Sequence, residues 1–277
     1  MKNINTLIED VKKVLVEPHK FSDNAVSEFA ESLAKTVINR INPDKRGGSL
    51  RLSNLGKSCD RELYYDVNAP ELGEDLPFEA RMKFLFGDIL EELLIFLAKE
   101  AGHTVTGQQD QLDLNGIKGH RDAVIDGMQV DVKSASSISY KKFKDGLTPE
   151  QDSFGYLTQQ NNYLEASQDD PLLTIKDKFA FFVIDKQLGH IHLDIHEKSK
   201  QNYRALAEQR KEMVLGPLPD RGFSSEEDGK SGNRKLGTKC SYCSYKKECW
   251  PMLRTFLYSN GPRYLTRVER LPDVPEV

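Results

Sequence analysis

The sequence lacks the features of several protein classes. None of its 277 residues belongs to an apolar run of about 18 residues, the length that a membrane-spanning helix needs. The first residues carry acidic side chains and no apolar segment of the kind found in a secretory signal peptide. No G-x4-G-K-[ST] motif of an ATP-driven helicase occurs. We therefore expect a cytoplasmic protein that makes no membrane contact and contains no helicase motor.

Cysteine is also scarce, and the charge is nearly balanced. Three of the four cysteines lie within residues 240–249, a spacing that favours metal ligation over disulfide bonds. Lys and Arg number 39 against 43 Asp and Glu, so the formal net charge is -4. This balance argues against a protein whose whole surface is basic, but it leaves room for a local basic groove that binds nucleic acid.

The sequence does contain two kinds of hydrophobic periodicity. Apolar residues recur at every third or fourth position in stretches that predict helices, at residues 3–16, 22–41, 78–101, 137–145, 152–167 and 197–214. Alternating apolar residues and turn dipeptides predict strands at residues 104–114, 117–125, 129–134, 178–186 and 190–196. Residues 216–238 are rich in Gly, Pro, Ser and charge, which predicts a mobile linker.

This order of elements predicts an α/β fold in which a mixed central β-sheet is flanked by helices. We expect three segments along the chain. Residues 1–77 would form a helical N-terminal region and residues 78–215 the core. Residues 216–277 would form a linker and a cysteine-rich C-terminal region that packs on the core.

Residues 119–133 bring two aspartates and a lysine together. Asp122 is expected in one strand and Asp131 and Lys133 in the next, on one face, with the neighbouring valines turned into the core. Carboxylates on adjacent strands provide the oxygen ligands that Mg²⁺ prefers. The bound ion would lower the pKa of a water molecule and offset the charge of a phosphate. Taken alone, an Asp-x-Lys strand is most often an ordinary solvent-exposed strand face.

The flanking helices carry further residues in a recurring pattern. The helix before the strands contains Gly87 and, one turn later, Glu91, and a helix after them contains Gln159 and, one turn later, Tyr163. With these neighbours the sequence resembles the PD-(D/E)XK nucleases, in particular their RecB-like branch, over residues 53–253. The family's motifs occur in order as Gly87–Glu91, Gly119–Asp122, Asp131–Lys133 and Gln159–Tyr163.

The resemblance implies a restriction-endonuclease-like core and a role for each motif. Asp122 and Asp131 would bind Mg²⁺ or Mn²⁺ together with the backbone carbonyl of Val132. Lys133 would serve the attacking water molecule. The remaining two residues would position the DNA or the lysine, and these are Gln159 and Tyr163.

Glu91 marks a departure from the RecB-like pattern, since many members have His at this position. Glutamate occurs there in the lambda-exonuclease-like branch of the fold, and it can also bind a metal ion. Whether the metal ligand is Glu91 or Glu92 stays open at the level of sequence. The alternative for Glu91 is an exposed helix charge.

The cysteines form a C-x2-C-x5-C pattern with a fourth cysteine far upstream, at Cys240, Cys243, Cys249 and Cys59. Four thiolates suit a zinc ion or an iron–sulfur cluster, and their spacing does not choose between them. The pattern resembles that of iron–sulfur nucleases, including the CRISPR-adaptation nuclease family and the AddB helicase–nuclease subunit. The resemblance implies a 4Fe–4S cluster that ties residues 53–65 to residues 240–253. Zinc is the alternative, as is a free buried thiol for the upstream cysteine.

Basic residues gather in two places. Residues 230–254 contain seven Lys and Arg against one Glu, interleaved with aromatic residues, a mixture that suits phosphate contacts and base stacking. A run of lysines also follows the Asp-x-Lys strand. Such runs usually form a solvated surface. The alternative is contact with DNA, which would involve Lys141, Lys142, Arg234, Lys235, Lys246 and Lys247.

The preferred interpretation is a metal-dependent DNA nuclease. Because RecB-like single-domain members mostly act at DNA ends, we expect an exonuclease on single-stranded or end-processed DNA. It would serve recombination, repair or the replication of a phage or mobile element, in the host cytoplasm if phage-encoded. It would act alone, as a homo-oligomer, or beside a helicase or annealing protein. The competing interpretations are a non-catalytic nucleic-acid-binding protein with a zinc or iron–sulfur site, and a structural protein with a four-cysteine zinc site.

Overall fold

The computed structural model describes residues 2–42 and 48–277, and the chain divides into two compact units. Unit 1 comprises Met1–Arg46, Arg51–Gly56 and Pro77–Glu208, and unit 2 comprises Gly47–Leu50, Lys57–Leu76 and Gln209–Val277. The predicted N-terminal segment is thus shared between the units, and its residue 1 and residues 43–47 lie outside the described residues. None of the described helices is both long enough and apolar enough to cross a membrane.

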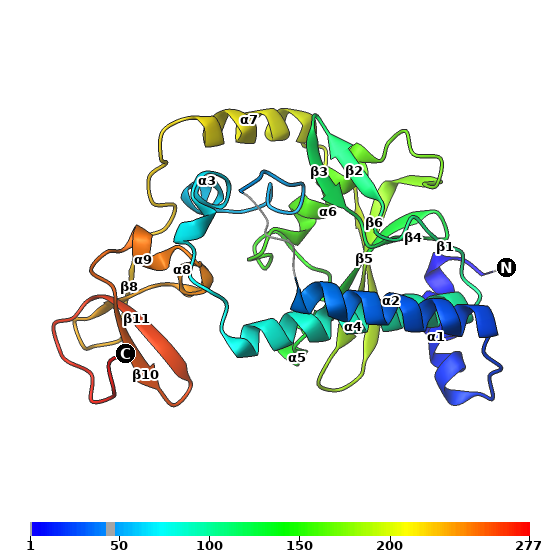
Figure 1. Cartoon of the computed structure of the whole chain (residues 1–277), viewed down its shortest axis with the longest axis horizontal. Helices are drawn as coiled ribbons and strands as arrows, with labels where there is room; N and C mark the ends of the chain where they lie inside the picture. Colours follow the sequence, from blue (N-terminus) through cyan, green and yellow to red (C-terminus); the bar gives the residue numbers. More distant parts are fainter. Residues whose placement is uncertain (1, 43–47) are drawn as a thin grey trace. The chain divides into compact units, whose positions relative to one another are not determined.

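Unit 1 is built on a mixed five-stranded sheet flanked by helices, which confirms the predicted α/β class (Figure 1). The strands lie in the order β1-β4-β5-β6-β7. β5 and β6 run parallel, and the other neighbours run antiparallel. The strands are β1 (Val105–Thr106), β4 (Ala123–Ile125), β5 (Met128–Ala135), β6 (Ile175–Asp185) and β7 (Ile191–Glu197).

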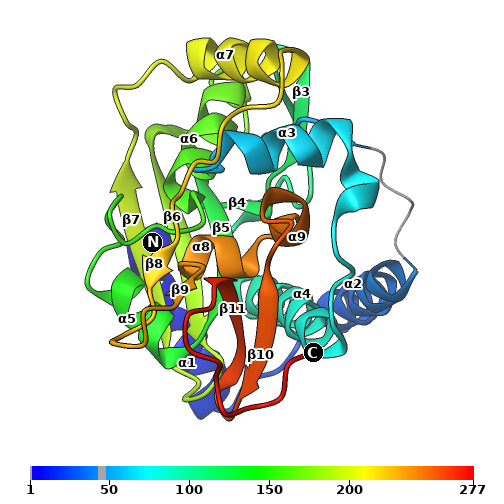
Figure 2. The same cartoon turned by 90° about the vertical axis from the view of Figure 1, so that its left-hand side faces the viewer.

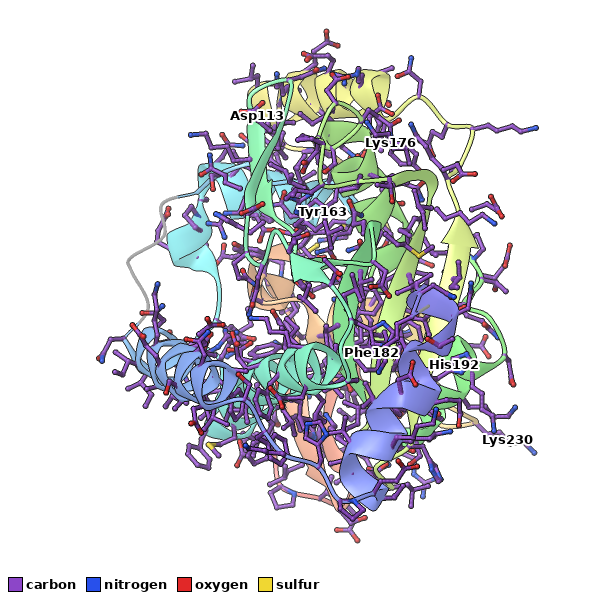
Figure 3. All side chains as sticks on the ribbon, turned by 90° about the vertical axis from the view of Figure 1, so that its right-hand side faces the viewer. Asp113, Tyr163, Lys176, Phe182, His192 and Lys230 are labelled. Atoms are coloured by element: carbon purple, nitrogen blue, oxygen red, sulfur yellow. The ribbon has the colours of Figure 1, made fainter. Side chains whose placement is uncertain are left out.

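Helices cover both faces of this sheet and bury a separate apolar core on each. On one face, α1 and α4 pack over Phe182 and Ala180 of β6, and Figure 3 labels Phe182 in the middle of the sheet. On the other face, α5 and α6 pack over Phe179 and Phe181, the alternate residues of the same strand. The helices are α1 (Leu7–Val16), which the short 3-10 helix η1 (Ile4–Thr6) precedes, α4 (Phe78–Glu100), α5 (Ser137–Lys144) and α6 (Tyr156–Ala166).

The helix α2 (Asp23–Ile41) lies along α4 (Figure 1). It begins after Ser22, whose side chain caps the helix by accepting a hydrogen bond from the Ala25 N–H group at 3.3 Å. The rings of Phe29 and Phe96 stack with their centroids 4.5 Å apart. This contact holds α2 to α4, although no residue of α2 is fully buried.

Two predicted strands are wrong, because each is interrupted. The stretch 104–114 is divided into β1 and β2 (Gln111–Leu114), and the stretch 117–125 is divided into β3 (Ile117–His120) and β4. β2 and β3 pair with each other as a separate two-stranded sheet. The predicted hairpin of β6 and β7 is confirmed. The helix predicted over 197–214 begins only at Tyr203, as α7 (Tyr203–Leu215).

A buried arginine explains the second interruption. Arg121 leaves the strand between β3 and β4 and turns inward, where it is 1% exposed. Its guanidinium lies 2.8 Å from Asp110 and 2.6 Å from Asp170. Gly107, with a positive φ of 59°, passes so close that a Cβ there would lie 2.5 Å from the guanidinium. The sequence predicted Asp122 within a strand, and this is wrong. Asp122 lies in the short connection before β4.

Unit 2 contains helices and a four-stranded antiparallel sheet of order β10-β11-β9-β8 (Figure 2). Its strands are β8 (Glu226–Glu227), β9 (Arg234–Lys235), β10 (Arg254–Tyr258) and β11 (Gly261–Arg267). The helices that lie entirely within unit 2 are α3 (Asp60–Asn68), η2 (Pro70–Leu72), α8 (Thr238–Tyr242) and α9 (Lys246–Cys249). The predicted linker over 216–238 is therefore partly wrong, since it contains β8 and β9. Strands of two residues are too short to give an alternating pattern.

Gly119 on β3 is packed too tightly to accept a side chain. A Cβ there would lie 2.7 Å from the Leu52 Cβ and 2.8 Å from the Tyr163 Cε1, and both of these side chains are buried. We expect Gly119→Ala to lower the free energy of unfolding by about 1–3 kcal/mol, measured by urea denaturation. Gly216→Ala is the control, because the nearest atom to its Cβ would lie 3.5 Å away. Equal stability of the two variants would contradict this packing.

Candidate functional site

β5 carries two of the predicted site residues on one face. Val130 and Val132 belong to the core beneath α1 and α4, which confirms that the valines point inward. Asp131 and Lys133 alternate with them and project to the other face of the sheet. The Lys133 Nζ lies 2.5 Å from Oδ2 of Asp131. The sequence therefore placed these two side chains correctly.

Asp122 joins this pair from the connection before β4. Its Oδ2 accepts a hydrogen bond of 2.8 Å from the Val132 N–H group. The backbone of β5 thus fixes the carboxylate of Asp122 although Asp122 is not in a strand. Burial raises the pKa of Asp122, and repulsion from Asp131 adds to this shift.

Glu91 approaches the same two aspartates from α4. Burial raises its pKa to about 9, and repulsion from Asp122 and Asp131 adds to the shift. Its Oε1 also accepts a hydrogen bond of 2.8 Å from the Gln109 side chain. Three carboxyl groups, from a helix, a loop and a strand, are therefore near enough to raise one another's pKa.

The carboxylate of Glu92 has hydrogen-bond partners outside the acidic cluster. Its carboxylate accepts hydrogen bonds from Ser32 at 2.7 Å and Thr36 at 3.2 Å, both on α2, and from Gln108 at 3.2 Å. It is 7% exposed. Of the two glutamates that the sequence left open, Glu91 is thus the one that faces the aspartates.

Burial is the main cause of a high pKa at all three carboxyl groups. It raises the pKa of Asp122 to about 7 and that of Glu91 to about 9, in each case with added repulsion between the acids. Burial also raises the pKa of Asp131, although attraction to Lys133 opposes this shift. Three acidic groups face one ammonium group, so the cluster has an excess of potential negative charge that a bound cation would compensate.

Lys133 is the cation that faces these acids. Burial alone would lower its pKa, but attraction to Asp131 and Asp122 outweighs burial and raises it. The Nζ also lies 4.9 Å from the centroid of the Tyr156 ring. Lys133 is therefore protonated at neutral pH, held between the acids on one side and an aromatic ring on the other.

Gln160 is a site residue that the sequence analysis missed. Its Nε2 donates a hydrogen bond of 2.7 Å to Oδ1 of Asp131. Its own side-chain oxygen accepts a hydrogen bond of 2.8 Å from Gln129. All three residues are at most 2% exposed, so this buried chain of hydrogen bonds fixes the carboxylate. The spacing of Gln129 and Asp131, two apart on one strand face, was the available signal.

Gln159 and Tyr163 lie next to this cluster, one turn apart on α6. Gln159 donates a hydrogen bond of 3.1 Å to the Tyr163 hydroxyl. Burial raises the pKa of Tyr163 to about 12. Figure 3 shows Tyr163 inside unit 1, below the hairpin that carries Asp113. The predicted pair is therefore formed, and its role in positioning DNA or the lysine stays a prediction.

Glu91, Asp122, Asp131 and the carbonyl of Val132 stay the predicted metal ligands. In the part of the chain that the structure describes, no three His, Cys, Asp or Glu side chains are already arranged as they would be around a metal ion. The excess of acidic groups is what favours such an ion.

The four cysteines line a single pocket within unit 2. All four are free thiols of intermediate exposure, and they come from the N-terminus of α3 and from α8 and α9, as Cys59, Cys240, Cys243 and Cys249. Arg61 and Lys239 also line this pocket and would favour thiolate charge. The convergence of Cys59 with the other three is the feature that the sequence could only suggest.

Burial favours the protonated form of two of these thiols. It raises the pKa of Cys240 to about 11 and that of Cys243 to about 12, and the neighbouring Cys59 adds to both shifts. A metal centre favours the thiolate form, because the thiolate is the ligand. The set of donors and their shared pocket therefore fit a thiolate-ligated metal centre, with zinc and 4Fe–4S both compatible.

Most of the basic residues predicted to contact DNA have partners within their own unit. In unit 2 the pairs are Lys246 and Lys247 with Glu74, Lys235 with Asp228, and Arg234 with Ser225. Lys246 is only 8% exposed, so its ion pair is structural. In unit 1 Lys141 pairs with Asp145, whereas Lys142 donates a hydrogen bond to a main-chain oxygen. DNA contact by these residues stays a prediction.

Comparison with known proteins gives little information about the function of this protein. No family model matches the chain, and no curated protein matches it in sequence. Among solved structures, the crystal structure of SSO0001 is similar to it at 17% sequence identity and a TM-score of 0.44. The match covers 81% of this chain and 96% of that one. A likeness of this size carries no argument about function, which therefore depends on the site itself.

The acidic cluster predicts an unusual dependence of stability on pH. The folded-state pKa values of Asp122 and Glu91 lie above their unfolded values of about 4. Without divalent metal, the free energy of unfolding should therefore fall as the pH rises from about 4 through about 7 and toward about 9. Asp122→Asn removes one of these groups and should be more stable than the parent at pH 8, on the order of 2 kcal/mol, with little difference near pH 4.

Urea denaturation in EDTA at several pH values measures this effect. Asp169→Asn is the matched control, because Asp169 is an exposed acid of the same unit. If Asp122→Asn and the parent lost stability equally with rising pH, the repulsion at Asp122 would be refuted.

Proposed function

We propose that this protein is a metal-dependent DNA nuclease, an exonuclease on single-stranded or end-processed DNA. The observation that supports it best is the convergence of Glu91, Asp122 and Asp131 on Lys133. These residues come from a helix, a loop and a strand, in the order of the nuclease motifs. Because the acidic groups outnumber the ammonium group, a divalent cation would compensate their charge. Mg²⁺ or Mn²⁺ bound there would activate a water molecule and offset charge on a phosphate.

The residues of the chain have separate tasks in this proposal. Glu91, Asp122, Asp131 and the Val132 carbonyl hold the ion. Lys133, protonated because of its raised pKa, orients the attacking water and neutralises charge that develops on the phosphate, so we do not assign it the removal of a proton. The buried amide of Gln160 keeps Asp131 aimed at the cluster.

We also propose that unit 1 has the restriction-endonuclease-like core that the resemblance implies. Its mixed sheet, with helices on both faces and the acidic residues at β4 and β5, supports this assignment. The protein would act in the cytoplasm, alone, as a homo-oligomer, or beside a helicase or annealing protein.

For unit 2 we propose a 4Fe–4S cluster held by Cys59, Cys240, Cys243 and Cys249, with zinc as the alternative metal. The shared pocket of four free thiols supports the site, and the resemblance favours iron over zinc. The centre would be structural, since it would tie α3 to α8 and α9 within the unit. Closing a long loop in this way removes conformational entropy from the unfolded chain.

Replacement of the lysine tests the nuclease. We expect Lys133→Ala to cut end-labelled single-stranded DNA at least about 100-fold more slowly than the parent in Mg²⁺ or Mn²⁺, because charge stabilisation at the phosphate is lost. EDTA should abolish cutting by the parent. DNA binding should survive the substitution, as measured by fluorescence anisotropy.

Lys118→Ala is the control for this experiment, because Lys118 is an exposed lysine on β3 of the same unit. Cutting by Lys133→Ala at the rate of Lys118→Ala would remove the catalytic assignment. Binding of DNA by a parent that cuts no substrate would favour the non-catalytic nucleic-acid-binding alternative.

Replacement of a cysteine tests the metal centre. We expect Cys243→Ser to lose iron and sulfide, together with the broad visible absorption of an iron–sulfur protein, and to melt at a lower temperature than the parent after anaerobic purification. Tyr242→Ser is the control, because Tyr242 is 79% exposed beside it. Zinc in place of iron would keep the site and change its metal, whereas unchanged metal content and melting temperature would refute the site.

A further inference from the structure

A pocket of about 220 Å³ opens beside Lys133 in unit 1. One part of its wall is polar and carries hydroxyl and amine groups from the end of β5, from α5 and from the end of β6, namely Ser134, Ser136, Ser139, Lys142 and Lys186. The wall also carries the aromatic rings of Phe154 and Tyr156. Hydroxyls and amines suit a phosphate group, and a flat ring suits a nucleobase.

The two lysines of this pocket are available to an anionic ligand. Lys142 donates a hydrogen bond of 3.2 Å to the main-chain oxygen of Gln151, and Lys186 is exposed. Over residues 2–42 and 48–277, neither lysine forms an ion pair. Asp152 is the acid that lines the pocket. Its carboxylate already accepts hydrogen bonds from three backbone N–H groups at the start of α6.

Phe154 offers an exposed aromatic surface next to the acidic cluster. It is 63% exposed, and its ring centroid lies 5.6 Å from that of Tyr156. The Tyr156 ring in turn lies 4.9 Å from the Lys133 ammonium. The pocket is therefore continuous with the site at which we propose hydrolysis, and Phe154 forms its outer edge.

We propose that this pocket binds one nucleotide of a single-stranded DNA chain next to the bond that is cut. Its phosphate lies against Lys142, Lys186 and the serine hydroxyls, and its base stacks on Phe154. A base within a duplex is paired and already stacked on its neighbours, so the ring of Phe154 receives an unpaired base. The inference rests on the proposed nuclease function and names its substrate as single-stranded DNA.

Binding of labelled oligothymidylate tests this inference without cleavage, by fluorescence anisotropy in EDTA at low salt. Loss of one stacked base costs about 1–3 kcal/mol, so Phe154→Ala should bind about 5- to 150-fold more weakly than the parent. Phe78→Ala is the matched control, because Phe78 is 70% exposed in the same unit and does not line the pocket. Its affinity should equal that of the parent.

Two further measurements separate stacking from a general loss of affinity. Oligothymidylate with 2-aminopurine at successive positions should lose fluorescence at one position when bound to the parent, and should keep it when bound to Phe154→Ala. Lys186→Ala should reduce the slope of log affinity against log salt by about 0.7, the effect of one lost phosphate contact on a single strand. Lys118→Ala should leave that slope unchanged.

The outcomes distinguish this inference from the nuclease proposal. Equal binding and cutting of single strands by Phe154→Ala and the parent overturns the pocket and leaves the nuclease standing. Equal affinity of the parent for duplex and single-stranded DNA also overturns the pocket. A parent that binds single strands through Phe154 but cuts nothing in Mg²⁺ or Mn²⁺ supports the pocket and refutes the nuclease.

Discussion

The electrostatic balance between three acidic side chains and one lysine is the constraint on which the site of unit 1 depends. Glu91, Asp122 and Asp131 reach one cluster from a helix, a loop and a strand, and the ammonium group of Lys133 cannot balance all three when they ionise. A purely structural core would be at least as stable with apolar residues in these positions. In the function that we propose, a cation and an anionic substrate would complete this arrangement of charges.

The helix α6 connects the parts of this arrangement. Its first residue, Tyr156, lies against Lys133 and the proposed nucleotide pocket, while Gln160 holds Asp131 from the next turn. One turn further on, Tyr163 packs against the β2–β3 hairpin at Gly119, where no side chain fits. Because one rigid helix makes all of these contacts, the pocket, the carboxylate and the hairpin keep a fixed spacing.

Local periodicity was enough to predict the α/β class and the side of β5 from which Asp131 and Lys133 project. It failed wherever the outcome depended on residues distant in sequence. Asp122 was assigned to a strand because the alternation continues through it, yet the burial of Arg121 against Asp170 breaks that strand. The choice between Glu91 and its neighbour depends on hydroxyl groups of α2. The strands β8 and β9 of unit 2 gave no signal, because each has only two residues.

Burial and repulsion raise the pKa values of Glu91 and Asp122, so these carboxyl groups hold protons more tightly than exposed acids do. The divalent cation that we propose would displace such protons, so its uptake would release acid into the solvent. The apparent affinity for the ion then rises with pH, and the measured heat of binding depends on the buffer that takes up the protons. Metal ions and protons would then compete for the same carboxylate oxygen atoms.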